Sequence, residues 1–397
     1  MTRARAQEAA LNEAARLAVG FQFTQGQGPV TLKAEVYRNL MLVEGRIQGS
    51  DPLRFILDTG AATSILDQRR ARDLGLRSLD RTAISGVGGI LEAVKAGGTL
   101  VRFPGVDLLN AQFVVISLDQ LSAHLGRRID GLLGEDLFTK LAVRMDYAHQ
   151  TVELSAPWLL AEKPQGVAVP VEIRRTPFVR LSVGTRQGPP AEGTFQIDTG
   201  FNGSLHIYRS FVDLHRILEG VPKLVRDRSV GATGVLEITR GRVESLNLGP
   251  FKLPSIVGSF YPPSYSSTGA GGHDGNLGGE ILRRFTVTFD YARRRMILEP
   301  GPSLTVAEEA DMSGLSLVAE GEKFDRVRVD AVAPNTPGAR AGVREGDWLE
   351  SVDETPAGAL GLEVLARRFR QPGTRCTVGL RRDGRIKRVT LRFARLV

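Results

Sequence analysis

The feature of this sequence that most limits its fold is an internal duplication. Three segments of the first half return in the same order in the second half. The pairs begin at Phe55 and Phe195 (Phe-x-x-Asp-Thr-Gly), at Asp130 and Asp274 (Asp-Gly-x-Leu-Gly), and at Val143 and Val287 (Val-x-x-Asp-Tyr-Ala). The differences between these residue numbers are 140, 144 and 144. A nearly constant offset indicates one structural unit that occurs twice.

Both units have the sequence pattern of a β-sheet protein. In the first unit, strands are predicted at residues 30–36, 40–47, 54–57, 113–116, 142–146 and 151–154. A short helix is predicted at residues 133–141, and the second unit should repeat this order from about Gly166 to Pro300. The 45 glycines and 20 prolines fit many short strands joined by turns. We therefore expect a mainly β fold with two tandem lobes.

The chain of 397 residues is too long for one ordinary hydrophobic core. We predict an N-terminal helical extension at 1–27, a first lobe at 28–156, a second lobe at 166–300 and a smaller α+β domain at 313–397. Residues 155–165, which contain two prolines, read as a linker. Residues 258–272 are rich in Ser, Pro and Gly and are interpreted as a solvated loop. A wall of a substrate cleft is the alternative for that segment.

The sequence leaves the compartment open. No apolar run approaches the length of a membrane span, so none is expected. Residues 1–20 lack the apolar core of a signal peptide. The protein is therefore cytoplasmic, or it is periplasmic or in the cell envelope after removal of a leader. The single cysteine, Cys376, excludes an intrachain disulfide and is interpreted as a small half-buried strand residue.

Charge and histidine content argue against two further classes of function. The net charge is +8, but the arginines are spread along the chain without a base-stacking aromatic pattern, so no nucleic-acid partner is expected. The five histidines are His124, His149, His206, His215 and His273. No pair has the spacing of a helical metal site, and neither a metal nor a cofactor is expected. His206 follows the second Asp-Thr-Gly closely and is interpreted as a surface residue.

The two Asp-Thr-Gly triplets, each after an apolar strand, define the candidate chemistry. Two carboxyls within hydrogen-bond distance cannot both ionise, so Asp58 and Asp198 would share one proton. One would act as a base toward a bound water and the other as an acid toward a carbonyl. Gly60 and Gly200 would let the backbone approach these carboxyls closely, and the hydroxyls of Thr59 and Thr199 would brace the two loops.

These residues carry a resemblance to a known family. Residues 56–66 resemble the active-site loop of the retropepsins, a family of aspartic peptidases. Residues 84–90 resemble the glycine-rich flap of that family, with Gly86, Gly88 and Gly89. Residues 129–138 resemble its apolar-apolar-Gly segment and following helix. The resemblance implies an acid-protease β-barrel and an endopeptidase that acts on peptide or protein substrates.

The second lobe resembles bacterial members of the same clan. Residues 230–234 stand where a second flap belongs, with Gly231 and Gly234. Asn276 departs from the pattern because it occupies an apolar position, which weakens the expected packing of this lobe. Retropepsins build their site from two identical chains. By resemblance, this protein would build it from two lobes of one chain, as a monomer with an internal pseudo-dimer.

Residues 313–397 resemble a bacterial PDZ domain of the type attached to envelope proteases. The candidate carboxylate-binding loop is Gly314, Leu315, Ser316 and Leu317. The strand that completes the sheet is expected from residues 386–393, the circularly permuted order. The resemblance implies binding of a C-terminal peptide along a sheet edge. The alternative is a domain that only docks on the lobes.

Two further functions stay open at this point. One is a non-catalytic peptide-binding or scaffold protein on a degenerate protease fold. In the other, the first lobe pairs with the first lobe of another chain to form the site, and the second lobe only supports it. For an active enzyme, the positions after Asp-Thr-Gly are Ala61 and Phe201, which cannot donate a hydrogen bond to a carboxyl. The dyad should then keep its shared proton to higher pH, which predicts a weakly acidic to near-neutral optimum.

Overall fold

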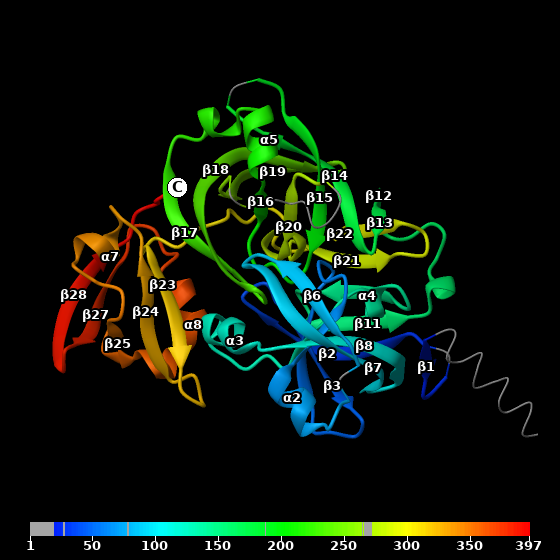
Figure 1. The fold of residues 1–397 in the computed structure, drawn as a ribbon. Coiled ribbons are helices and arrows are strands. Elements are labelled where there is room, and N and C mark those ends of the chain that lie inside the picture. Colours follow the sequence, from blue (N-terminus) through cyan, green and yellow to red (C-terminus); the bar gives the residue numbers. More distant parts are fainter. Residues whose placement is uncertain (1–19, 27, 78, 187, 264, 266–271) are drawn as a thin grey trace, which may run out of the picture.

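The computed structural model describes residues 20–26, 28–77, 79–186, 188–263, 265 and 272–397 (Figure 1). Two β lobes lie against each other, and a third, smaller domain lies beside them (Figure 1). The prediction of a mainly β fold is confirmed, since strands in three sheets make up most of the regular structure in these residues. None of the helices in the described ranges is long and apolar enough to cross a membrane.

The first lobe consists mainly of strands. They are β1 (Phe21–Phe23), β2 (Val30–Tyr37), β3 (Leu40–Ile47), β4 (Leu53–Leu57), β5 (Ser64–Asp67), β6 (Arg81–Gly86), β7 (Gly89–Phe103), β8 (Val106–Ile116), β9 (Gly131–Leu133), β10 (Ala142–Asp146) and β11 (Thr151–Ser155). Its helices are α2 (Gln68–Asp73), α3 (Asp119–Leu125) and α4 (Glu135–Phe138). Leu57 and Leu133 are buried in its core, which follows from their inward position on paired strands.

The second lobe repeats this order after a short 3-10 turn, η1 (Pro157–Leu159). Its strands are β12 (Val167–Pro170), β13 (Glu172–Arg174), β14 (Thr176–Gly184), β15 (Ala191–Asp198), β16 (Leu205–Ile207), β17 (Leu224–Gly231), β18 (Gly234–Leu248), β19 (Phe251–Phe260), β20 (Gly275–Gly278), β21 (Phe285–Asp290) and β22 (Arg295–Pro300). Its helical segments are α5 (Arg209–Leu214), η2 (Ile217–Gly220) and α6 (Gly279–Leu282).

Strand order shows the duplication directly. The sheet path β3-β4-β9-β5-β8-β7-β6 of the first lobe has the same connectivity as β14-β15-β20-β16-β19-β18-β17 of the second. In both lobes the strand that leads into Asp-Thr-Gly pairs in parallel with a short later strand, β4 with β9 and β15 with β20. The repeated sequence segments therefore lie at equivalent places in two similar sheets.

A shared sheet joins the lobes. β10 pairs antiparallel with β21, and its register runs from Val143 opposite Phe289 to Asp146 opposite Thr286. β12 and β22 continue this sheet on one side, and β11 and β2 continue it on the other. Val143 and Phe289 are both almost fully buried in one core that spans the two lobes. This shared sheet and core set the orientation in which the two active-site loops meet.

The third domain has its own core and sheet. Its strands are β23 (Leu315–Glu320), β24 (Arg326–Val332), β25 (Trp348–Val352), β26 (Thr355–Pro356), β27 (Arg375–Arg382) and β28 (Arg385–Arg392), with helices α7 (Pro337–Arg340) and α8 (Ala357–Arg368). The sheet order is β23-β24-β25-β27-β28, so β28 extends the sheet at the edge opposite β23. Cys376 lies on β27 and is buried rather than half-buried.

Several local expectations are corrected. The helix expected at 133–141 covers only α4, because Leu133 belongs to β9. Residues 1–19 and 27 of the expected helical extension lie outside the described residues, and residues 21–23 form β1, paired with β8, instead of helix. The loop expected from residue 258 starts later, because β19 continues to Phe260.

Candidate active site

The two Asp-Thr-Gly loops meet at the lobe interface and brace each other through their threonines. The hydroxyl of Thr59 donates to the carbonyl of Ile197 at 2.7 Å, and that of Thr199 donates to the carbonyl of Leu57 at 2.7 Å. Each hydroxyl also accepts the backbone N–H of the other threonine, at 2.9 and 3.1 Å. Four hydrogen bonds in a closed, buried set hold the two loops in one relative position.

The carboxyls of Asp58 and Asp198 lie side by side between these loops and are hydrogen-bonded to each other. Each also accepts the N–H of the glycine two residues later, at 2.9 Å from Gly60 and 3.1 Å from Gly200. A Cβ at Gly60 would lie 2.6 Å from Cγ of Asp198, and one at Gly200 would lie 2.3 Å from Cγ of Asp58. Each loop therefore needs glycine at this position, because any side chain would collide with the carboxyl of the other lobe.

Burial determines how this pair ionises. Desolvation and the neighbouring Asp198 charge raise the pKa of the Asp58 carboxyl well above its usual value. Desolvation also raises the pKa of Asp198, while N–H groups of Asn276 and Gly200 counteract that rise. A buried pair of this type keeps one proton over a wide pH range, so one carboxyl is an acid and the other a base.

Asn276 has a role that the sequence did not reveal. Its Nδ2 donates to Oδ2 of Asp198 at 2.7 Å, and its Oδ1 accepts the hydroxyl of Tyr208 at 2.7 Å. The inference from Ala61 and Phe201 that the dyad lacks a side-chain donor therefore does not hold for Asp198. It was based only on the residues after Asp-Thr-Gly, whereas the donor comes from β20. The polar residue in an apolar position was the available signal, and it marked a contact with the dyad.

The interpretation of His206 as a surface residue is also wrong. Its ring is 3% exposed and stacks on Phe201, with ring centroids 3.5 Å apart. The hydroxyl of Tyr261 lies 3.0 Å from Nδ1 of His206. Burial, with repulsion from Arg240, holds the pKa of this imidazole well below its usual value, so the ring is neutral. His206 lines the same cavity as Asp198.

Two hairpins cover the carboxyls, and their tips touch. Gly86 pairs with Gly89 at the end of β6 and β7, and Gly231 pairs with Gly234 at the end of β17 and β18. The N–H of Gly88 donates to the hydroxyl of Thr233 at 3.0 Å. A Cβ at Gly88 would lie 2.4 Å from Cα of Gly234, so the two tips approach as closely as glycine allows.

Each lobe also sends a turn across to the other lobe. Nδ2 of Asn39 donates to the carbonyl of Asn202 at 2.7 Å and to Glu280 at 2.8 Å. At the equivalent place in the second lobe, Arg175 donates to the carbonyl of Ala62 at 2.5 Å and to the carboxylate of Glu135 at 2.8 Å. Both turns therefore hold the loop that follows Asp-Thr-Gly in the opposite lobe. The sequence repeat gave no indication of this, because Asn39 and Arg175 are different residue types.

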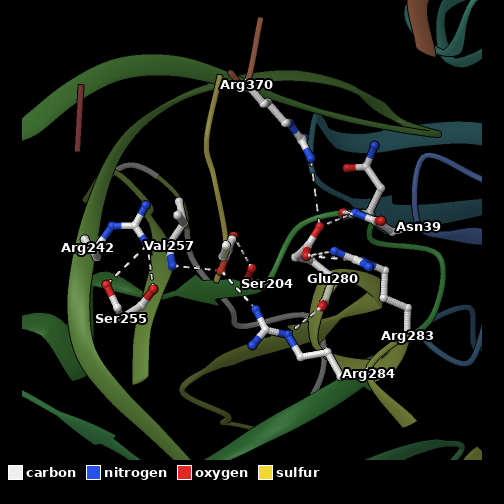
Figure 2. A network of polar contacts seen from close by, with 11 residues as sticks. Asn39, Ser204, Arg242, Ser255, Val257, Glu280, Arg283, Arg284 and Arg370 are labelled. Carbon is white, nitrogen blue, oxygen red and sulfur yellow. Dashed lines mark hydrogen bonds and ion pairs between the residues drawn. The ribbon is translucent and has the colours of Figure 1, made fainter. Parts of the chain in front are cut away.

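Glu280 connects all three parts of the molecule. Figure 2 shows its carboxylate between Asn39 of the first lobe and Arg370 of the third domain, with Arg283 beside it. Nη1 of Arg370 lies 3.9 Å from Oε2 of Glu280. In the segment that connects the second lobe to the third domain, Glu308 accepts the hydroxyl of Ser204 at 2.5 Å and the N–H of Val257 at 3.1 Å. These contacts anchor the third domain close to the second active-site loop.

One cavity of about 1130 Å³ contains both the dyad and the expected carboxylate-binding loop. It is lined by Asp58 and Asp198, by both hairpin tips, and by Gly314, Leu315, Ser316 and Leu317 of the third domain. Helix α3 of the first lobe packs against β23 (Figure 1). A side chain at Gly126 would collide with Leu362 of α8. In the described part of the chain, no group of three or more His, Cys, Asp or Glu side chains converges to hold a metal ion.

Comparison with known proteins identifies two of the parts. Residues 43–137 match the family model for aspartyl proteases, and residues 328–382 match the model for a PDZ domain. The chain therefore carries a retropepsin-like aspartyl protease domain in its N-terminal part and a PDZ domain at its C-terminal end. These domains indicate protein substrates and peptide binding as the classes of partner.

Two further comparisons add context. An aspartic proteinase from Irpex lacteus superposes with a TM-score of 0.47 at 13% identity, and the match covers 70% of this chain and 99% of that protein. No curated protein matches this sequence.

Proposed function

We propose that this protein is an aspartic endopeptidase whose two lobes each supply one catalytic aspartate, Asp58 and Asp198. The observation that carries the proposal is the hydrogen-bonded pair of carboxyls, held by reciprocal threonine bonds at the floor of a cavity large enough for a peptide. A degenerate scaffold would have no need for two buried carboxyls, because an idle pair of this kind destabilises the fold.

The reaction follows from the protonation state of the pair. The ionised carboxyl removes a proton from a water molecule, and the water oxygen attacks the peptide carbonyl carbon. The protonated carboxyl donates to the carbonyl oxygen, which gives a gem-diol. The first carboxyl then passes its new proton to the amide nitrogen as the C–N bond breaks, and a diol proton returns to the second. These proton transfers return both carboxyls to their starting states, and they require neither a metal nor a covalent intermediate.

We propose that the two glycine-rich hairpins act as flaps over the substrate. Their tips touch across the cavity through Gly88 and Thr233, so a peptide must enter while they are apart. Closing the flaps over a peptide excludes bulk water from the carboxyls, which strengthens the hydrogen bonds that the reaction needs. Two different flaps, one from each lobe, distinguish this arrangement from a site with one flexible cover.

We propose that the PDZ domain positions peptide substrates for the lobes. The loop of Gly314, Leu315, Ser316 and Leu317 borders the same cavity as the dyad, and β23 has no strand partner on its outer edge in the described chain. The contact of α3 with β23 and α8 favours the alternative in which this domain only docks. Both roles are compatible with the ion pair between Arg228 and Asp330, at 2.8 Å, which joins the second lobe to β24.

A peptide-library digest tests the peptidase function. The wild type should cleave internal peptide bonds, and Asp58→Asn should not, while both proteins give the same circular dichroism spectrum. Cleavage by the variant at the wild-type rate would contradict the mechanism. Size-exclusion chromatography of the active protein is the companion measurement, since activity confined to a dimer would support pairing of first lobes from two chains.

A further inference from the structure

The dyad is asymmetric in its side-chain hydrogen bonds. Asn276 lies on β20, opposite Gln196 of β15 and His206 of β16. Its amide bridges two groups, since Nδ2 donates to Oδ2 of Asp198 and Oδ1 accepts from Tyr208. The hydroxyl of Tyr208 thereby fixes the orientation of the amide, with the N–H group toward the carboxylate.

In the described residues of the first lobe, an apolar side chain stands where Asn276 stands in the second. The register of β9 puts Leu132 opposite Ile56 and Ile65, in the position that Asn276 has in the second lobe. Leu132 is buried in an apolar cluster and has no N–H group to offer. The backbone donors, by contrast, are matched, since the N–H of Gly60 donates to Asp58 and the N–H of Gly200 donates to Asp198. In the described chain, the side-chain hydrogen bond from Asn276 is therefore what Asp198 has and Asp58 lacks.

We propose that Asn276 is a positioning residue that keeps the negative charge of the dyad on Asp198, so that Asp198 is the base toward water and Asp58 the acid toward the carbonyl. This assignment rests on the proposed peptidase function and extends it to the role of each lobe. A hydrogen bond to the ionised form stabilises that form. The pKa directions agree, since the pKa of Asp58 is raised well above its usual value and the Asn276 amide counteracts the rise at Asp198.

Four titratable side chains of the second lobe that line or border the cavity near Asn276 in the described chain are neutral. Burial raises the pKa of the phenols of Tyr208, Tyr261 and Tyr265, so these groups stay neutral. The imidazole of His206 is neutral as well. Arg240, which also lines the cavity, is paired with Asp227 at 2.8 Å. The uncharged amide is thus the donor that distinguishes Asp198 from Asp58.

The assignment fixes the direction of each proton. Asp198 takes a proton from water as the water oxygen bonds to the carbonyl carbon, and Asp58 gives its proton to the carbonyl oxygen. When the gem-diol collapses, Asp198 protonates the departing nitrogen and Asp58 recovers a proton from the diol. The cycle ends with an acid and an amine, and with the dyad in its starting state. With the roles reversed, Asn276 would stabilise the wrong ground state.

The test uses the full-length protein with ¹³C-labelled aspartate carboxyls. NMR titration should show that Asp198 ionises at lower pH than Asp58, with signals assigned through Asp58→Asn and Asp198→Asn. Asn276→Leu, which copies the residue of the first lobe, should raise the apparent pKa of Asp198 by about one unit. Tyr208→Phe should move it less and in the same direction. Asn247→Leu, in the same lobe and with a side-chain amide that donates to Ser182, is the matched control and should leave it unchanged.

Activity gives a second readout. In Asn276→Leu the acidic limb of the kcat/KM–pH profile should move to higher pH by about one unit, while a purely structural role would lower activity at every pH. If Asn276→Leu does not fold, Tyr208→Phe carries the test. Equal titration of Asp198 in wild type and variants, or ionisation of Asp58 first, would overturn the assignment. Absence of any peptide cleavage would instead refute the peptidase function, and the NMR titration would still decide the role of Asn276.

Discussion

The two lobes share a strand order but differ in the side chains that face the dyad. In the first lobe, Ile65 of β5 pairs with Leu132 of β9. In the second lobe, the same two positions hold His206 and Asn276. The first pair belongs to an apolar cluster, and the second belongs to a hydrogen-bonded set with Tyr208 and Tyr261. An apolar wall and a polar aromatic wall therefore flank one pair of aspartates.

This difference shows what a single chain with two lobes can do. The paired strands and the threonine braces are the same in both halves, because both halves must present a carboxyl at the same depth. Side chains that face the cleft are under no such constraint, and two copies within one chain can diverge independently. A site made from two identical chains would carry the same residue on both sides.

The largest effect is expected from the aspartates, where the lobes should be equivalent. Asp58→Asn and Asp198→Asn should each lower kcat/KM by about 10³-fold or more, because the pair needs both an acid and a base. Kinetics with one cleaved peptide checks this, and thermal unfolding shows that the fold is retained. If one variant kept near wild-type turnover, the lobes would not contribute one carboxyl each.

The flap tips come next, because each lobe provides one. Gly88→Val should lower kcat/KM by about tenfold or more, since the new side chain would collide with the backbone of Thr233 and Gly234 and hold the tips apart. The free energy of unfolding should change by less than about 1 kcal/mol, because the tips lie outside the core. Thr233→Val, which removes only the hydroxyl that Gly88 contacts, is the control and should act more weakly. Unchanged kinetics in Gly88→Val would exclude a flap role.

Removal of the PDZ domain tests what this domain adds to the two lobes, since Asp330 of β24 lies 2.8 Å from Arg228 of the second lobe and 3.5 Å from His124 of the first. A protein that lacks residues 313–397 should cleave short peptides at a similar rate but select protein substrates less well. Rates on a peptide and on a protein that contains the same cleavage sequence check this. Equal processing of both substrates by the full and shortened forms would favour the docking-only role.

Stability should depend on pH through the shared carboxyls. Burial raises the pKa of Asp58 and of Asp198 in the folded state, so the folded protein binds more protons than the unfolded one above about pH 4. The free energy of unfolding should therefore fall as pH rises from there through the folded-state pKa values. Asp58→Asn removes this penalty and should melt at a higher temperature than wild type at neutral pH, with little difference at pH 3. Identical melting curves at both pH values would contradict the raised pKa values.

The smallest effect is expected at Ala61, whose side chain gives Asp58 no donor. Ala61→Ser would supply a hydroxyl to Asp58, lower the pKa of the proton that Asp58 holds, and shift the basic limb of the kcat/KM–pH profile downward by less than about one unit. The change makes the first lobe more like the second, where Asn276 already donates to Asp198. A shift of the acidic limb alone would point to the opposite assignment of acid and base.

The sequence by itself determined the duplicated β unit, the placement of both Asp-Thr-Gly loops at strand ends, and the two glycine-rich turns. These are local patterns that occur twice, and each copy supports the interpretation of the other. Residues 43–137 and 328–382 are likewise recognisable from sequence, as the family matches show. Local pattern does not decide residues whose environment comes from distant strands, which is why the sequence places His206 on the surface although it is buried.

The tertiary structure decided which side chains serve the dyad. Asn276 reaches Asp198 because β15, β20 and β16 are neighbours in one sheet, although 78 residues separate the two side chains. Asn39 and Arg175 hold the opposite active-site loops because the lobes face each other across β10 and β21. Hydrogen bonds of this kind depend on a few tenths of an ångström between groups far apart in the chain. Hydrophobic periodicity records which face of a strand is buried, but it does not record which polar group the opposite strand will present there.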